Sequence, residues 1–237
     1  MSAEVDLRKG KIRPKTFTVV RKAVAFLCRI IFGLRIKGQE NIPAEGGFIL
    51  VGNHLHNLDP VFMLTSSTRP VYFMAKQELF QIPGIRQLIS WVGAFPVNRG
   101  KMDRSAIKQG QRVLQEGIGL GIYPEGTRSL SRKIDRVLPG AGLFATGGDY
   151  LIVPCAVTGS ESLPFNGGKG RGTPPDRNPG HKGVLVRFGE PFRLPDEIDG
   201  RKVNAKAATD YMMSKVAEML PEEYRGIYGD SMIQPDL

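Results

Sequence analysis

Residues 48–60 read Phe-Ile-Leu-Val-Gly-Asn-His-Leu-His-Asn-Leu-Asp-Pro, and this stretch decides the fold class. Its first five residues are a short apolar run, which is typical of a strand buried on both faces. Asp59 and Pro60 then indicate the start of a helix, because Asp favours the N-cap and Pro the first helical position. The stretch therefore predicts a buried strand, a polar turn and a helix in direct succession.

The same alternation of strand and helix continues along the chain. Short strands separated by helices predict an α/β fold with a mostly parallel central sheet flanked by helices. Ser160–Gly183 holds six Gly and four Pro, so we expect a long loop there. We predict further strands at Val71–Met74, Val92–Val97, Gly119–Tyr123, Leu151–Val157 and Val184–Phe188, and further helices at Thr16–Leu34, within Ile85–Trp91, from Asp103, and at Arg201–Leu220.

The positive charge of the chain is concentrated at one end. The 237 residues carry a formal net charge of +10, and 41% apolar with 24% charged residues excludes general disorder. Residues 1–37 hold ten Lys or Arg against two acidic residues, whereas the rest is nearly balanced. We therefore predict a basic arm with an interfacial helix over 1–37 and an α/β domain over 38–237. Cys28 and Cys155 lie in apolar runs, which favours buried thiols over a disulfide.

Thr16–Leu34 predicts a helix that lies on a membrane surface. A spanning helix needs about 20 mostly apolar residues, and three basic residues interrupt this segment. An apolar stripe beside cations is typical of interfacial helices, although a helix packed on its own domain is the alternative. Nucleic acid is not expected as a partner, because no nucleic-acid fold signature is present. The stripe consists of Phe17, Val20, Val24, Leu27, Ile31 and Leu34, with Lys15, Lys22 and Arg29 elsewhere on the helix.

The polar turn after the first buried strand contains a candidate acid–base pair. His54 and Asp59 are five positions apart across a turn into a helix, so a carboxylate can hold one ring nitrogen while the other removes a proton. The chain has no Gly-x-Ser-x-Gly elbow, so the nucleophile can be a substrate hydroxyl. The plain alternative is an N-cap aspartate beside a loop histidine.

A metal site at the same turn is disfavoured. His54 and His56 have the spacing of two ligands on an extended segment, but a catalytic zinc usually needs three protein ligands. The third histidine of the chain, His181, lies in the Gly/Pro-rich loop. We therefore expect no metal and treat His56 as structural.

Two arginines follow the predicted strands at the same edge of the sheet. Arg99 comes after Val92–Val97, and Arg128 comes after Gly119–Tyr123. A guanidinium suits bidentate binding of phosphate, although Glu125 is an alternative ion-pair partner for Arg128.

Four segments of the chain form a combined pattern: Asn53-His54-x4-Asp59, Gly93-x-Phe95-x3-Arg99, Pro124-Glu125-Gly126-Thr127-Arg128-Ser129 and Ile152-Val153-Pro154. In this order and spacing they resemble the glycerolipid acyltransferase family, most closely its short 1-acylglycerol-3-phosphate (lysophosphatidic acid) acyltransferases. The resemblance covers roughly residues 17–191 and implies an acyl-CoA or acyl-carrier-protein donor, no metal or other cofactor, and an N-terminal helical segment in one leaflet.

The resemblance also implies roles for individual residues. By this resemblance, His54 would be the general base on the acceptor hydroxyl, and Asp59 would orient it. Lys76 lies in a segment that resembles a phosphate-holding element of the family. One departure concerns residues 136–140, where many relatives have Phe-Lys-x-Gly and this chain has no lysine at that place. The implied phosphate ligands are Lys76, Arg99 and Arg128, in a pocket shaped by Glu125, Gly126 and Thr127.

The function expected from these features is acylation of the sn-2 hydroxyl of lysophosphatidic acid at the cytoplasmic face of a membrane, with the protein bound peripherally or monotopically to a lipid surface that we expect to be anionic. One alternative keeps the chemistry but uses another lysolipid or a hydroxylated lipid as acceptor. Another is a non-catalytic membrane-binding protein, which the presence of both His54 and Asp59 disfavours.

Overall fold

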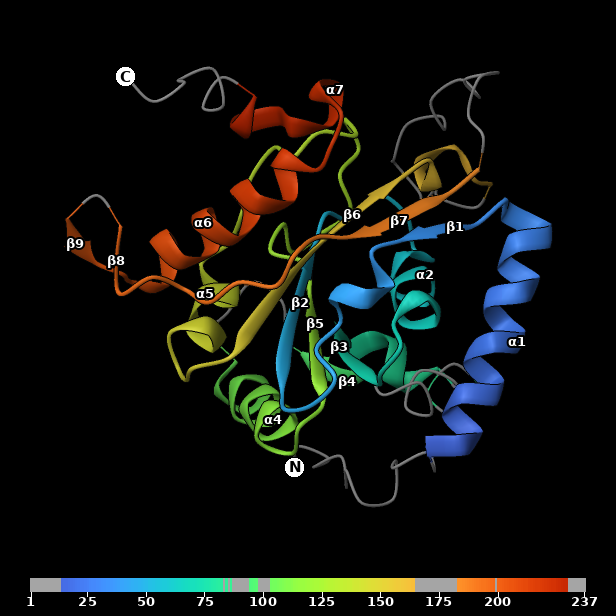
Figure 1. The fold of residues 1–237 in the computed structure, drawn as a ribbon, viewed down its shortest axis with the longest axis horizontal. Helices are drawn as coiled ribbons and strands as arrows, with labels where there is room; N and C mark the ends of the chain where they lie inside the picture. Colours follow the sequence, from blue (N-terminus) through green and yellow to red (C-terminus); the bar gives the residue numbers. More distant parts are fainter. Residues whose placement is uncertain are drawn as a thin grey trace.

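The computed structural model describes residues 14–82, 84, 86, 94–97, 103–164, 183–198 and 200–229. In this part of the chain, seven strands form one sheet in the order β1-β7-β6-β2-β5-β3-β4. Helices cover both faces of the sheet (Figure 1), which confirms the predicted α/β fold. The strands span Arg35–Lys37 (β1), Phe48–Gly52 (β2), Val71–Lys76 (β3), Phe95–Val97 (β4), Gly119–Ile122 (β5), Leu151–Thr158 (β6) and Leu185–Phe188 (β7).

β2 lies at the middle of the sheet, between β5 and β6, and both neighbours run parallel to it. β3 and β4 extend the parallel part on the β5 side. β7 runs antiparallel to β6, and β1 runs parallel to β7, so these two strands oppose the others. The sheet is therefore mostly parallel, as predicted. The carboxyl ends of its parallel strands meet at one edge, where open α/β sheets bind their ligands.

The core is divided into two layers by the sheet. Successive side chains of a strand point to opposite faces, so every residue of β2 is buried while alternating between the two layers. Ile49 and Val51 belong to the layer that includes Phe144 of α5 (Gly140–Ala145) and Met212 of α6 (Ala205–Glu218). Phe48 and Leu50 belong to the other layer, together with Phe62 of α2 (Asp59–Ser66). This double burial explains why the sequence of β2 is a continuous apolar run.

Helix α1 (Pro14–Phe32) packs on helix α2 (Asp59–Ser66) at one side of the molecule (Figure 1). The Phe32 and Phe62 rings meet edge to face with centroids 5.6 Å apart. Arg21 donates from Nη1 to the backbone oxygen of Thr65 at 3.3 Å. Cys28 is buried in the same layer of the core. α1 is therefore docked on the α/β domain along one of its sides.

The outer side of α1 carries exposed apolar side chains. The predicted stripe mixes two sides of the helix: Leu27 and Ile31 are exposed, whereas Leu34 is buried beyond the helix end and Val24 packs on the core. Spacings of three and four fit both the packed and the exposed side, which is why the pattern did not separate them. More than half of each side chain is exposed at Val19, Phe26, Leu27, Ile30 and Ile31.

Two later helices differ in how well their starts are predicted. α4 (Arg104–Gln115) begins after Asp103, whose side chain caps the N–H groups of Ser105 and Ala106. Arg201–Leu220 is predicted as one helix, but α6 begins only at Ala205, because residues 201–202 pair with 197–198 in a short hairpin. The remaining elements are α5 (Gly140–Ala145), α6 (Ala205–Glu218), α7 (Glu222–Arg225), β8 (Glu197–Ile198), β9 (Arg201–Lys202) and the 3-10 helices Gln39–Asn41, Gln77–Gln81, Ser160–Ser162 and Gly226–Tyr228.

Several predictions fall outside the described residues. They are most of the helix within 85–91, the start of the strand at 92–97, and residues 165–182 of the predicted loop. Among the residues that the structure describes, no helix combines the length and the apolar character needed to cross a membrane.

Candidate active site

The end of β2 fixes the position of His54. Asn53 follows the strand, and its side chain is bonded to β6: Nδ2 donates to the Val157 oxygen and Oδ1 accepts from the Val157 nitrogen, both at 2.8 Å. This double contact holds the chain where it leaves the sheet. His54 follows directly and is only 7% exposed. The histidine is thereby held at the carboxyl edge of the parallel strands.

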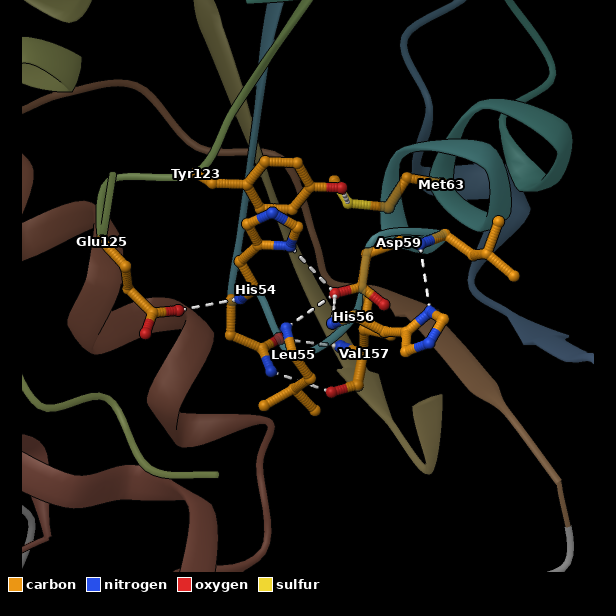
Figure 2. A network of polar contacts seen from close by, with 10 residues as sticks. His54, Leu55, His56, Asp59, Met63, Tyr123, Glu125 and Val157 are labelled. Carbon is orange, nitrogen blue, oxygen red and sulfur yellow. Dashed lines mark hydrogen bonds and ion pairs between the residues drawn. The ribbon is translucent and has the colours of Figure 1, made fainter. Parts of the chain in front are cut away.

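Asp59 lies beside His54, as the spacing of the two residues predicts. Its Oδ2 atom is 3.0 Å from His54 Nδ1, and it also accepts from the N–H groups of Leu55 and His56 at 2.6 Å each (Figure 2). The predicted N-cap role of Asp59 is wrong, since Leu58 occupies the N-cap and makes no side-chain bond. Asp59 is the first residue of α2, and its carboxylate turns back toward the preceding loop.

The contact with Asp59 determines which nitrogen of His54 is open to a substrate. A carboxylate only accepts hydrogen bonds, so Nδ1 carries the hydrogen of the neutral ring and Nε2 presents a lone pair. Within the described residues, Nε2 of His54 has no hydrogen-bond partner. An imidazole held in this way can accept a proton from a bound hydroxyl.

The segment after β5, residues 123–129, holds the backbone of His54 from the other side. Glu125 Oε1 accepts from the His54 N–H at 2.8 Å, and the Ser129 N–H donates to the His54 carbonyl at 2.7 Å. Between them, Gly126 has a φ of 68°, a left-handed conformation that glycine adopts without strain. The turn at His54 and the segment 123–129 are about 70 residues apart and look like separate motifs in the sequence. In the structure they form one unit.

Glu125 is a buried acid rather than a surface carboxylate. Only 3% of the residue is exposed, and burial raises the pKa of Glu125 to about 8. The hydrogen bond from the His54 N–H lowers this pKa, while Asp135 and Asp59 raise it. The carboxyl group is therefore mostly protonated at neutral pH. In the described contacts it meets the backbone of His54, and its predicted part in a phosphate pocket stays a prediction.

Tyr123 contacts His54 directly, and the sequence reasoning missed it. The two rings stack with centroids 4.2 Å apart and planes inclined by 19°. The phenol donates to the sulfur of Met63 at 3.0 Å (Figure 2), and the ring also stacks with Phe73 at a centroid distance of 5.7 Å. This stack restricts rotation of the imidazole. The available signal was an aromatic residue directly after β5 and directly before Pro124-Glu125.

The basic residues predicted to bind phosphate differ in exposure and in whether the structure describes them. Lys76 is exposed and is the last residue of β3, where it pairs in register with Val97 of β4. Thr127 and Arg128 are half-buried in the segment after β5. β3 and β5 are adjacent parallel strands. Lys76 ends β3, and Arg128 lies in the segment that follows the carboxyl end of β5. Arg99 lies outside the described residues.

The ring of His56 is engaged in local contacts. Its Nδ1 accepts from the Leu58 N–H at 3.1 Å, and its Nε2 lies 3.2 Å from the Pro164 carbonyl oxygen. Over the residues that the structure describes, no group of three or more His, Cys, Asp or Glu side chains is arranged to hold a metal ion.

The sequence model of the acyltransferase family matches residues 33–158, which is more than half of the chain. The chain belongs to the acyltransferase family. The matched region begins just before β1 and ends with β6, so it contains both His54 and Asp59 as well as Lys76 and the segment 123–129. The pair that spacing and geometry bring together thus lies inside the acyltransferase domain.

Curated members of the acyltransferase family resemble the chain over part of their length. A 1-acyl-sn-glycerol-3-phosphate acyltransferase of Bacillus subtilis is 36% identical over 132 residues, which are 55% of this chain and 65% of the relative. One of Chlamydomonas reinhardtii is 30% identical over 200 residues, which are 81% of this chain and 58% of the relative. The chain therefore spans less than two thirds of the length of these relatives.

A solved structure shares the fold of this acyltransferase-family chain. The crystal structure of PlsC, a 1-acyl-sn-glycerophosphate acyltransferase from Thermotoga maritima, superposes with a TM-score of 0.60 and 22% sequence identity. The superposition covers 91% of this chain and 86% of PlsC. The shared architecture extends over nearly all of both chains.

Proposed function

We propose that the protein is a 1-acylglycerol-3-phosphate O-acyltransferase, which moves a fatty acyl group from a thioester donor to the sn-2 hydroxyl of lysophosphatidic acid and forms phosphatidic acid. The observation that carries this proposal is the contact between His54 and Asp59, with Nε2 of His54 open at the carboxyl edge of an acyltransferase-family sheet. The names of the relatives supply the substrate class.

The proposed reaction uses His54 as a proton carrier. Nε2 accepts the proton of the acceptor hydroxyl while the hydroxyl oxygen attacks the carbonyl carbon of the thioester. Asp59 stabilises the imidazolium that forms, through its contact with Nδ1. The tetrahedral intermediate then breaks its carbon–sulfur bond, and the departing thiolate takes the proton from Nε2. The products are the ester and the free thiol, and no other cofactor enters these steps.

The acceptor phosphate gives the second part of the proposal. We assign Lys76, Arg99 and Arg128 as its cationic ligands, because a fixed phosphate places the hydroxyl for attack. In support, Lys76 ends β3 and Arg128 follows the adjacent β5, while Arg99 comes two residues after β4, the other neighbour of β3. Glu125, Gly126 and Thr127 would shape this end of the site.

A kinetic assay of the purified protein tests this function. The donors are palmitoyl-CoA and an acyl carrier protein thioester, and the acceptors are lysophosphatidic acid, lysophosphatidylcholine and lysophosphatidylglycerol. We expect turnover with lysophosphatidic acid and loss of at least about 1,000-fold in His54→Ala, because the base is removed. Full activity of His54→Ala would contradict the mechanism. Preference for an acceptor without a phosphate monoester would contradict the substrate assignment.

We further propose attachment to the cytoplasmic face of a membrane, and the outer side of α1 supports attachment to a membrane surface. Phe26 and Ile30 are among the apolar side chains exposed there, and Lys22 and Arg29 are also exposed on this helix. An apolar surface with cations beside it binds the interface of anionic lipids. The contacts of Arg21 and Phe32 with α2 leave that outer side open.

Vesicle binding tests this attachment. The double variant Phe26→Ser/Ile30→Ser should bind phosphatidylglycerol-containing vesicles at least about tenfold more weakly, because full burial of each side chain is worth about 1.5–3 kcal/mol. Its thermal stability should be unchanged, since both side chains are exposed. Added salt should weaken binding of the unaltered protein. Unchanged binding by the double variant in a co-sedimentation assay would contradict a role of this surface.

A further inference from the structure

The His56 ring is bonded at both nitrogen atoms, although the proposed mechanism does not use it. The Leu58 N–H donates to Nδ1 at 3.1 Å, and Nε2 lies 3.2 Å from the carbonyl oxygen of Pro164. The residue is 1% exposed and lies next to Asp59 (Figure 2). The ring is therefore enclosed between the catalytic turn and the segment that follows β6.

Both contacts require the same protonation state of the ring. Nδ1 accepts an N–H, so it carries a lone pair, and Nε2 must then carry the hydrogen that is donated to Pro164. A protonated ring would turn a second donor toward the Leu58 N–H. Burial lowers the pKa of His56, which keeps the ring neutral. The Pro164 carbonyl thus selects the tautomer that binds Leu58.

The contact with Leu58 acts inside the turn that carries the His54–Asp59 pair. His56 also donates its backbone N–H to Asp59 Oδ2 at 2.6 Å and accepts the Asp59 N–H at 3.0 Å. Those two backbone contacts are available to any residue at position 56. The ring contact depends on the side chain, and it restrains the residue directly before Asp59.

We propose that His56 is a positioning residue: its neutral ring, held by Pro164 through Nε2, binds the Leu58 N–H through Nδ1 and thereby fixes how α2 presents Asp59 to His54. This inference rests on the proposed function, since it concerns the geometry of the same base. The contact with Leu58 aligns the His54–Asp59 pair, and the contact with Pro164 selects the tautomer of His56.

Two variants separate the two contacts. In His56→Asn, the amide oxygen occupies the place of Nδ1 and can accept the Leu58 N–H, but no atom reaches Pro164. In His56→Gln, the longer amide places its nitrogen near the position of Nε2 and can donate to Pro164, but no acceptor remains for Leu58. The measurements are kcat and KM with palmitoyl-CoA and lysophosphatidic acid, and the unfolding midpoint of each variant in urea.

We expect His56→Asn to keep kcat within about threefold, whereas His56→Gln loses about 10- to 100-fold in kcat with KM nearly unchanged, because a small displacement of a catalytic group is enough for such a loss. Equal losses in kcat, losses that follow the unfolding midpoints, or losses confined to KM would overturn the inference. An unaltered protein without acyltransferase activity would instead overturn the proposed function. The activity of the unaltered protein therefore separates the two failures.

Discussion

A single oxygen atom holds the candidate active site together at the scale of residues. Asp59 Oδ2 accepts from His54 Nδ1 and from the N–H groups of Leu55 and His56. The other oxygen, Oδ1, is buried and has no hydrogen-bond partner among the described residues. Three donors converging on one oxygen favour an ionised carboxylate, since bonds to charged acceptors are the stronger ones. Asp59 therefore orients the His54 ring and closes the turn at the same time.

The charge of Asp59 can be tested with Asp59→Asn. The amide oxygen still accepts hydrogen bonds, but it no longer stabilises an imidazolium on His54. We expect kcat to fall by about 10²- to 10⁴-fold, with little change in the KM for lysophosphatidic acid. Steady-state kinetics measure this loss, and circular dichroism checks that the variant is folded. Activity within tenfold of the unaltered enzyme would show that the negative charge is not needed.

The buried acid Glu125 makes stability depend on pH. Its pKa rises from an ordinary 4.5 to about 8 in the folded protein, so the folded state holds the extra proton across this window. The contribution of Glu125 to the free energy of unfolding should therefore be highest below about pH 4.5 and should fall as the pH rises through 8. The total fall is about 1.4 kcal/mol for each unit by which the two pKa values differ.

The variant Glu125→Gln isolates this effect. Glutamine carries no charge, and its Oε1 can still accept the His54 N–H that Glu125 Oε1 accepts. In urea unfolding at pH 5, 7 and 9, the fall in stability should be smaller for the variant than for the unaltered protein. Parallel pH curves for the two proteins would contradict a buried, protonated Glu125.

The sequence predicted the pair at the site but not its surroundings. His54 and Asp59 are close in the chain, so their spacing alone brings them within reach. The stacking of Tyr123 on His54 depends on the adjacency of β2 and β5, and the contact of His56 with Pro164 depends on β6 lying next to β2. A single sequence carries no measure of such tertiary contacts, and this is why both residues received no catalytic assignment.

At the scale of elements, the close packing of α5 on α6 requires a residue without a side chain, Gly142. A Cβ at Gly142 would overlap the backbone oxygen of Ala205, whereas a Cβ at Gly140 would meet nothing within 4 Å. Gly142→Ala should therefore destabilise the protein by about 1–3 kcal/mol, because the helices must separate. Gly140→Ala should be neutral or slightly stabilising, since alanine favours helix. Urea unfolding compares them, and equal stabilities would contradict this close approach.

The elements that the sequence predicted are those with a strong local signal. β2 and β6 are apolar runs, and α4 has a capping aspartate. β1 was missed, because its three residues, Arg-Ile-Lys, form a strand only by pairing with β7. The hairpin of β8 and β9 shortened a predicted helix for the same reason, since pairing between strands overrides local helix propensity.

At the scale of the whole molecule, the two cysteines should become accessible to solvent at different stages of unfolding. Both thiols are free and buried, and burial raises the pKa of each. Cys155 lies on β6, an interior strand next to β2, whereas Cys28 lies on α1. Exposing Cys155 requires global unfolding, but exposing Cys28 requires only that α1 leaves α2.

Thiol labelling in increasing urea should therefore modify Cys28 before Cys155, and neither thiol should react quickly in the absence of urea. Mass spectrometry of peptides from the labelled protein assigns each site. Simultaneous labelling of both cysteines would mean that α1 and the sheet unfold as one cooperative unit.

The backbone of His54 is held at both ends by the segment after β5: Glu125 takes its N–H, and Ser129 donates to its carbonyl. Arg128, the residue assigned to the acceptor phosphate, lies between these two attachment points. A displacement of Arg128 would therefore reach the His54 backbone through these two hydrogen bonds. Under the assignment proposed for Arg128, binding of the acceptor phosphate would also align the His54 imidazole, so an acceptor without the phosphate would lose alignment together with affinity.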